Sequence, residues 1–140
     1  MELKSASLPG PKLAGTALTL IHAGRAATRS ELTSQLGVTR ATTGAVTAEL
    51  RDLGLIVVDS GPGGGQQGRP SHRVVPDPRG PVALAAQVHP DGFAVALIGL
   101  GGVIAARRGW NARVPADPAR ALATVAEAGV ALLRASGQPT

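Results

Sequence analysis

The sequence contains no cysteine and only two aromatic residues, Phe93 and Trp110. Without thiols the chain can form neither a disulfide nor a thiolate zinc site, and His22, His72 and His89 show no metal-ligand spacing. Modules that bind single-stranded nucleic acids stack the bases on aromatic side chains. We therefore expect no metal and no cofactor, and a duplex rather than a single strand if the partner is a nucleic acid.

Long apolar runs are also missing. No uninterrupted apolar segment approaches the roughly 18 residues that a membrane-spanning helix needs. The first residues, MELKSASLPGPK, lack the basic-then-apolar order of a secretory signal peptide, so we expect a cytoplasmic chain with no membrane contact. Hydrophobic residues still make up 44% of the 140, enough for the folded core of one medium domain or two small ones.

Basic residues outnumber acidic residues by 14 to 9, which gives a net charge of +5 and a pI near 11.3. This excess favours a polyanionic partner without identifying it. Of the 14 basic residues, 12 are arginine, the side chain better suited to bidentate contacts and narrow grooves. A composition rich in Ala, Gly and Arg can equally reflect genome base bias, so the charge is a modest signal.

The sequence is organised around residues 28–53, which have the pattern of two short helices joined by a tight turn. Thr28 is placed to cap the first helix with Glu31 as its reciprocal partner, and Gly37 ends it. Thr39 is placed to cap the second helix. This pattern is typical of a helix-turn-helix, although a helical hairpin in an ordinary core would use the same capping residues.

The second helix of the pair has an unusual surface. Val46, Leu50 and Leu53 recur at helical spacing and are predicted to face the core. The predicted outward face consists of Arg40, Ala41, Gly44, Ala45 and Ala48. Solvated helix faces normally carry Glu and Lys, whereas this face is small and nearly uncharged. It suits a helix that enters a DNA major groove about 12 Å wide and touches the base edges.

The flanking segments complete the pattern of a winged helix. A first helix is expected over residues 11–23, and residues 25–27 would supply a short strand. Two runs rich in β-branched residues, 55–59 and 72–75, flank a glycine-rich loop at 61–68. They predict a β-hairpin, the wing.

The informative part of the wing is the tripeptide Gly68-Arg69-Pro70. Pro70 holds the preceding residue extended, and Gly68 lets the backbone approach a surface closely. Arg69 could therefore lie along the floor of a narrow, electronegative minor groove, with a simple turn as the alternative.

The predicted DNA-binding residues form three groups. Phosphate contacts are expected from Thr28, Arg29, Ser30, Thr39 and Thr47. Major-groove contacts are expected from Arg40, Ala41, Thr42, Gly44 and Ala45. Minor-groove contacts are expected from Gly68, Arg69 and Pro70. Amide groups and positive charge at a helix start can hold a phosphate, although Arg29 and Ser30 could serve in simple capping.

The second half of the chain has a different pattern. Residues 76–81 contain three prolines and predict a stiff linker that forms neither helix nor strand. Residues 82–88, 93–100 and 103–108 predict three strands joined by tight turns. Asp117 would cap a last helix, with Pro118 in its first turn and Gly137 at its end. Its apolar stripe would cover one sheet face and consist of Leu122, Val125, Gly129, Leu132 and Leu133.

The first helix, the helix pair, the Gly-Arg-Pro wing and a strand pair ending in Gly99-Leu100-Gly101-Gly102-Val103-Ile104 resemble the ROK family of repressors, open reading frames and sugar kinases. The resemblance spans about residues 13–108. It implies a winged helix that binds operator DNA, followed by an actin-like sugar-sensing domain, usually in a dimer or tetramer. The expected fold is α+β, with a winged helix-turn-helix at 1–75, a linker at 76–81 and a truncated actin-like piece of three antiparallel strands and one helix at 82–140.

Several departures from the family bear on function. Its members generally carry Ala where Thr33 stands and an aliphatic residue where Thr43 stands, so each hydroxyl must bond back to its own helix or cost about 1–3 kcal/mol. The positions that match the ATP-phosphate loop of the kinase members are Gln87, His89, Pro90 and Asp91. Proline removes an amide and a carboxylate repels phosphate, so we expect no enzyme activity.

The resemblance also implies several hundred further residues with the rest of the sugar site, so we expect this chain to be a fragment, a degenerate short paralogue or an engineered piece. A sugar effector would then bind a full-length relative, because the site is incomplete here. A sheet edge and one sheet face would stay uncovered, which favours a homodimer. The resulting hypothesis is a sequence-specific DNA-binding repressor. The alternatives are a sugar-kinase remnant and a winged-helix module that binds proteins.

Overall fold

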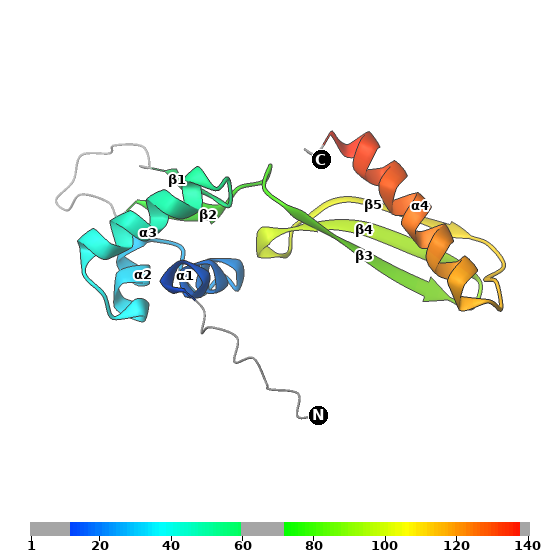
Figure 1. Ribbon diagram of the computed structural model, residues 1–140, viewed down its shortest axis with the longest axis horizontal. Coiled ribbons are helices and arrows are strands. Elements are labelled where there is room, and N and C mark those ends of the chain that lie inside the picture. Colours follow the sequence, from blue (N-terminus) through cyan, green and yellow to red (C-terminus); the bar gives the residue numbers. More distant parts are fainter. Residues whose placement is uncertain (1–11, 60–71, 138–140) are drawn as a thin grey trace, which may run out of the picture. The chain divides into compact units, whose positions relative to one another are not determined.

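The computed structural model describes residues 12–59 and 72–137 of the chain (Figure 1). The chain divides into two compact units, Met1–Val75 and Pro76–Thr140. Each unit combines helices with a small antiparallel sheet, so the predicted α+β class is confirmed. In the ranges described, no helix combines the length and the apolar character that crossing a membrane requires.

In its described residues, the first unit contains three helices and a two-stranded sheet. Its elements are α1 (Leu13–His22), α2 (Arg29–Leu36), α3 (Arg40–Asp52), β1 (Ile56–Asp59) and β2 (Arg73–Pro76). One cluster of buried residues joins all of them and consists of Ala17, Ile21, Ala26, Leu32, Val46, Leu50, Ile56 and Val74. The predicted helix-turn-helix followed by a hairpin is therefore present, and α1 is shorter than predicted at both ends.

The prediction of a strand at residues 25–27 is wrong, because these residues form no strand. The amides of Arg25 and Ala26 both donate to the Leu20 carbonyl, and the Ala27 amide donates to the Glu31 carboxylate at 2.6 Å. The end of α1 and the start of α2 therefore use the donors that a strand would need. What remains is a single antiparallel bridge between Thr28 and Arg73.

Leu53, predicted to face the core, is 63% exposed. The reason is that α3 ends at Asp52 and Gly54, with φ +68°, turns the chain away from the helix direction. The next core position after Leu50 is filled instead by Ile56 of β1, which is 1% exposed.

The second unit is an antiparallel meander of three strands, β3 (Val82–His89), β4 (Gly92–Gly99) and β5 (Ile104–Asn111), with β4 in the middle. A short 3-10 turn, η1 (Leu100–Gly102), joins β4 to β5. The last helix, α4 (Pro118–Ser136), packs on one face of this sheet (Figure 1). The three predicted strands and their covering helix are thus confirmed.

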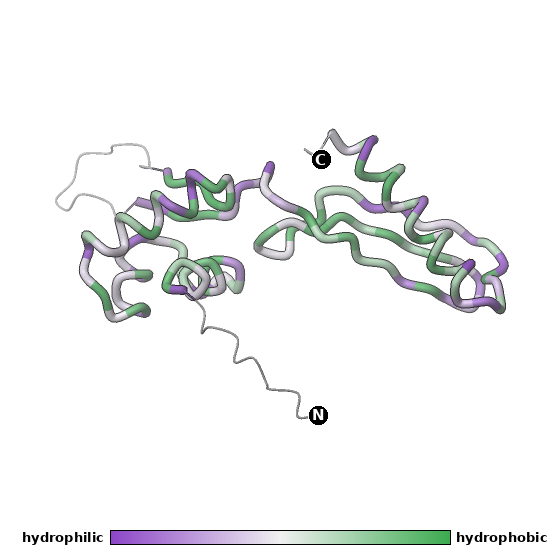
Figure 2. The backbone as a smooth tube through the Cα atoms, viewed as in Figure 1, coloured by the Kyte–Doolittle hydropathy of each residue, from purple (hydrophilic) through white to green (hydrophobic). Residues whose placement is uncertain are grey.

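Every second side chain of β4 contributes to the core between α4 and the sheet. Phe93, Val95 and Leu97 are buried, and Phe93 and Val95 pack with Ala121 and Val125 of α4. Side chains alternate between the two faces of a strand, so every second residue of β4 points to the other face. Apolar residues line both the strands and the helix in Figure 2.

Two predictions in this unit need correction. Leu122 is 68% exposed, because the line of α4 that meets the sheet is Ala121, Val125 and Gly129, and a helix turns about 100° per residue. The linker predicted at residues 76–81 begins with the last residue of β2, Pro76. The rest contains a hydrogen-bonded turn in which the Gly80 amide donates to the Asp77 carbonyl at 2.9 Å.

Candidate nucleic-acid interface

The start of α2 is held by the predicted capping box. The Thr28 hydroxyl accepts the Glu31 amide at 3.2 Å, and the Glu31 carboxylate accepts the Thr28 amide at 3.1 Å. Two of the amides that a helix start leaves unpaired are thereby satisfied. The Thr28 hydroxyl is engaged in this cap, so only its remaining lone pair and its own proton are available to a ligand.

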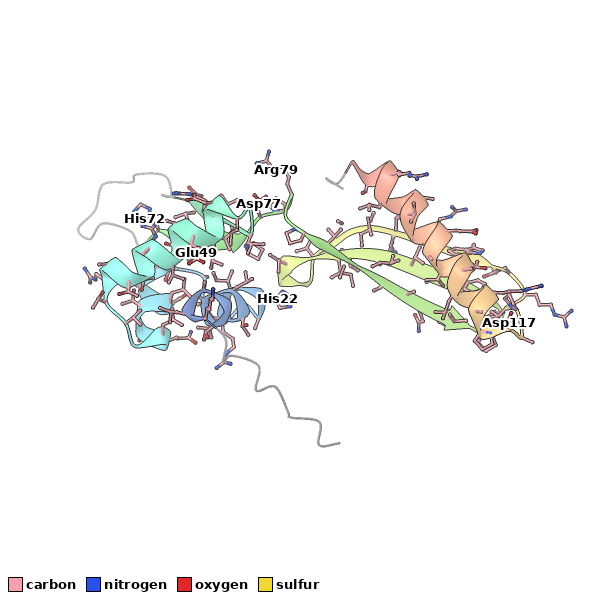
Figure 3. All side chains as sticks on the ribbon, viewed as in Figure 1. His22, Glu49, His72, Asp77, Arg79 and Asp117 are labelled. Carbon is pink, nitrogen blue, oxygen red and sulfur yellow. The ribbon has the colours of Figure 1, made fainter. Side chains whose placement is uncertain are left out.

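Arg29 and Ser30 follow this cap at the start of α2, beside the second strand of the hairpin. The Arg29 amide donates to the His72 carbonyl at 3.0 Å, and Ser30 is exposed. Within the described ranges, Arg29 Nε and His72 Nδ1 are buried nitrogen atoms with no hydrogen-bond partner. The structure therefore brings Arg29 next to His72 (labelled in Figure 3), a residue that sequence reasoning did not select. Its only signal was its place at the start of the second wing strand.

The crossing of α2 and α3 contains two threonine hydroxyls. The Thr33 Oγ1 atom lies 2.8 Å from the Arg29 carbonyl oxygen and 2.8 Å from Thr43 Oγ1. Thr43 Oγ1 also lies 3.2 Å from the Thr39 carbonyl oxygen. Thr43 thus donates to its own helix, and the single Thr33 proton is shared between the Arg29 carbonyl of its own helix and the Thr43 oxygen of the other helix.

The start of α3 is capped by Thr39, as predicted. Its hydroxyl accepts the Thr42 amide at 3.2 Å, and the two hydroxyl oxygens of Thr39 and Thr42 lie 2.9 Å apart. Thr39 is exposed and Thr42 is half-buried. The pair places two hydroxyl groups at the positive end of the α3 dipole, where phosphate oxygens are favoured.

The predicted outward face of α3 lies at the surface. Arg40, Ala41 and Ala45 are exposed, and Gly44 and Ala48 are half-buried. A Cβ atom added at Gly44 would meet no atom within 4 Å. Packing inside the protein therefore does not require a glycine in the middle of α3, although glycine weakens a helix interior. The absence of a side chain at Gly44 instead allows a ligand to approach this face of α3 closely.

Thr47 was predicted to contact phosphate, and this prediction is wrong. The residue is 0% exposed, and its hydroxyl lies 2.9 Å from the Thr43 carbonyl oxygen and 3.0 Å from the Gly44 carbonyl oxygen. Two residues of helix rotate its side chain by about 200° from the exposed Ala45, which turns it into the core. It stabilises the inner side of α3 and cannot reach a ligand.

Charge is distributed unevenly along α3. Arg40, in the first turn, has no ion-pair partner in the described part of the chain. At the other end, Arg51 pairs with Asp52 at 2.9 Å, and Glu49 is exposed (Figure 3). Carboxylates repel phosphate, so the first half of α3 suits a polyanion better than the second half.

The predicted minor-groove residues Gly68, Arg69 and Pro70 lie outside the described residues. The strands that flank them, β1 and β2, are hydrogen-bonded to each other as a two-stranded sheet. The role of the tripeptide stays a prediction.

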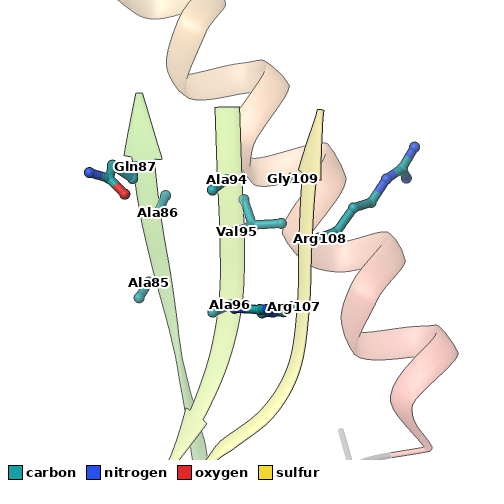
Figure 4. A pocket seen from close by; sticks show the side chains of 9 residues that line it. All are labelled: Ala85, Ala86, Gln87, Ala94, Val95, Ala96, Arg107, Arg108 and Gly109. Atoms are coloured by element: carbon teal, nitrogen blue, oxygen red, sulfur yellow. The ribbon is translucent and has the colours of Figure 1, made fainter. Parts of the chain in front are cut away.

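The second unit has an open hollow of about 700 Å³ in its sheet (Figure 4). Its lining consists of Ala85, Ala86, Gln87, Ala94, Val95, Ala96, Arg107, Arg108 and Gly109. The Arg108 guanidinium lies 5.5 Å from the centre of the Trp110 ring. None of the lining residues carries a carboxylate, hydroxyl or imidazole, so the hollow offers no group for acid-base or nucleophilic chemistry.

The turn between β3 and β4 contains Pro90 and Asp91, two of the positions that match the ATP-phosphate loop of the kinases in the resembled family. Pro90 offers no amide there, and the Asp91 carbonyl accepts the Ala112 amide at 3.0 Å. A Cβ atom added at Gly92 would lie 2.5 Å from the Trp110 carbonyl oxygen, so β5 closes over the backbone at this point. The loop is unsuited to cradling a phosphate.

No protein-family model matches the chain, and no curated protein matches its sequence. Among solved structures, the chain is similar to one described as the ROK family transcriptional regulator, a homologue of the E. coli MLC protein. The two are 21% identical with a TM-score of 0.56, and the match covers 87% of this chain and 31% of that chain. The likeness shows a shared fold, a winged helix-turn-helix followed by three antiparallel strands and one helix.

Proposed function

We propose that this chain is a transcriptional regulator that binds duplex DNA sequence-specifically, a repressor in origin that acts as a homodimer. The observation that carries the proposal is the outward face of α3, where Arg40 is exposed without an ion-pair partner among the described residues and where Gly44 serves no internal packing. The shared fold with a structure described as a transcriptional regulator supports it.

In the proposed complex the first half of α3 enters the major groove. Arg40 can pair with a guanine edge through two parallel hydrogen bonds, and the small side chains of Ala41 and Ala45 let the helix axis come close to the bases. Gly44 lies on the same side and adds no bulk. Base contacts of this kind specify sequence, whereas phosphate contacts position the protein.

Phosphate contacts would come from the starts of the two helices. Arg29 and Ser30 in the first turn of α2, with Thr39 at the start of α3, offer charge and hydroxyls toward the DNA backbone. Thr42, predicted for the major groove, joins this group in the proposal because its hydroxyl oxygen lies 2.9 Å from that of Thr39. His72 lies against the Arg29 amide and joins this group in the proposal. We propose that Arg69 reads the adjacent minor groove.

The test begins with selection of binding sites from random duplexes, followed by fluorescence anisotropy on the selected operator. Arg40→Ala should weaken binding by about 1–3 kcal/mol, or roughly 5- to 150-fold, if the side chain pairs with a guanine. Arg51→Ala is the matched control, because Arg51 is exposed at the far end of α3 and pairs with Asp52. Equal effects of the two changes would contradict the proposed orientation of α3.

The wing is tested separately with operators that differ only in their flanks. Arg69→Ala should weaken binding mainly where the flanks are A·T-rich, because a narrow minor groove attracts arginine most strongly. An equal loss on G·C-rich flanks would contradict a minor-groove role.

Salt dependence separates DNA recognition from a protein-interaction role. Release of counterions makes the affinity for DNA fall steeply as salt rises. We expect a linear fall of log affinity with log salt for the wild type. Two results together would contradict the proposal: the chain binds a protein partner tightly with an affinity that does not change with salt, and the selection from random duplexes yields no binding site.

A further inference from the structure

The face of α4 that points away from the sheet has an exposed apolar centre between two opposite charges. The buried line of α4 is Ala121, Val125 and Gly129. On the opposite side lies an open surface formed by Ala126, Glu127, Val130, Ala131 and Arg134, which we call the α4 outer face. Val130, at its centre, is 47% exposed.

The two charges of this face do not serve α4 itself. Glu127 and Arg134 are seven residues apart, which is about two helical turns, so they project from one side with Val130 between them. Charges that stabilise a single helix are spaced three or four residues apart. Neither side chain has an ion-pair partner in the described ranges, whereas Arg120 lies 3.9 Å from Asp117.

This spacing is self-complementary in one arrangement of two helices. If two copies of α4 cross antiparallel about a twofold axis between Val130 and Ala131, each Glu127 faces the Arg134 of the other copy. The same operation places Val130 on the partner's Ala131. A parallel arrangement would instead place Glu127 against Glu127 and Arg134 against Arg134. Twofold interfaces require this kind of self-complementary patch.

We propose that the α4 outer face binds the α4 outer face of a second copy of this chain, with the two helices antiparallel. Two reciprocal pairs between Glu127 and Arg134 would flank the apolar centre. Alanine at positions 126 and 131 leaves room for the helix axes to approach to about 8–10 Å. The partner is inferred from charge. The face carries a negative charge at one end and a positive charge at the other, so a second copy in the antiparallel direction presents the opposite charge at each end.

The contact is small and therefore weak on its own. Two turns of helix on each copy bury less than the roughly 1,200–2,000 Å² of a stable interface. The association should appear at protein concentrations of about 0.1–1 mM and tighten when two copies bind one DNA, because linked binding events reinforce each other. The inference rests on the homodimer of the proposed function and names its surface.

Sedimentation equilibrium of the full chain, without DNA, tests the pairing. Glu127→Arg and Arg134→Glu should each lower the association constant about tenfold or more, because each replaces two attractions across the axis by two repulsions. The double variant should restore the wild-type value. An equimolar mixture of the two single variants should associate better than either alone, because one copy then carries two arginines on the face and the other two glutamates.

Arg120→Glu is the matched control, since it reverses a charge of α4 outside the paired turns, and it should leave association unchanged. Wild-type protein that stays monomeric throughout, or single variants that associate as well as the wild type, would overturn the pairing. So would a folded double variant that fails to recover. Operator binding is measured on the same samples. Wild-type protein that stays monomeric up to about 1 mM but still binds its operator would overturn the pairing while leaving the DNA-binding function intact.

Discussion

Gly44→Ala should raise the stability of the protein and lower its affinity for DNA. In a helix interior alanine is more favourable than glycine by about 0.5–1 kcal/mol. The added Cβ atom would meet no atom within 4 Å, so no steric cost opposes this gain. For a domain of this size the gain corresponds to a rise in melting temperature of roughly 2–8 °C.

The loss of DNA affinity has a different origin. Gly44 shares the outward side of α3 with the exposed residues Ala41 and Ala45. A methyl group added there would push the helix away from the base edges and lengthen the hydrogen bonds that depend on close approach. We expect the dissociation constant for the selected operator to rise about tenfold, which is about 1.4 kcal/mol.

Thermal unfolding and fluorescence anisotropy on the same variant measure both effects. Gly15→Ala is the matched control, because Gly15 is an exposed glycine of α1, and it should leave operator affinity unchanged. If Gly44→Ala stabilises the protein but binds the operator as tightly as the wild type, α3 does not lie close against the bases and the proposed docking is refuted.

Three further variants test other contacts. Gly92→Ala should destabilise the protein by about 1–3 kcal/mol in urea unfolding, because its Cβ atom would lie 2.5 Å from the Trp110 backbone oxygen, and wild-type stability would contradict that clash. Thr47→Val should keep operator affinity within about twofold, because the buried hydroxyl bonds only within α3; a shallower salt dependence of binding would instead revive a phosphate contact. Thr28→Ala should cost about 0.5–2 kcal/mol of unfolding free energy, since it removes the cap of α2, and calorimetry would show no change if Glu31 alone held the helix start.

The features that could be predicted from the sequence are those fixed by neighbouring residues. Thr28 with Glu31 predicts the capping box, and Gly37 predicts the left-handed end of α2, where the structure has φ +63°. Asp117 with Pro118 predicts the start of α4. Each depends on backbone groups within a few positions, so the chain segment alone determines the outcome.

The predictions that failed depend on contacts between elements. The strand at residues 25–27 was lost to competition for its amides from α1 and from Glu31, which a hydrophobic pattern does not report. Thr47 is a different case: it was assigned a phosphate contact, but its angle around α3, next to the buried Val46, places it inside. The pairing of Arg29 with His72 joins residues far apart in sequence, so only the folded hairpin could reveal it.

The hydroxyl pair at the helix crossing affects how this motif can change during evolution. Besides contacting each other, the two hydroxyls each have a carbonyl acceptor in their own helix. Thr33 Oγ1 lies 2.8 Å from the Arg29 carbonyl oxygen, and Thr43 Oγ1 lies 3.2 Å from the Thr39 carbonyl oxygen. Replacing either threonine with an aliphatic residue leaves the remaining hydroxyl satisfied by its own backbone. A lineage can therefore pass between polar and apolar versions of this crossing one mutation at a time, without an intermediate that buries an unbonded oxygen.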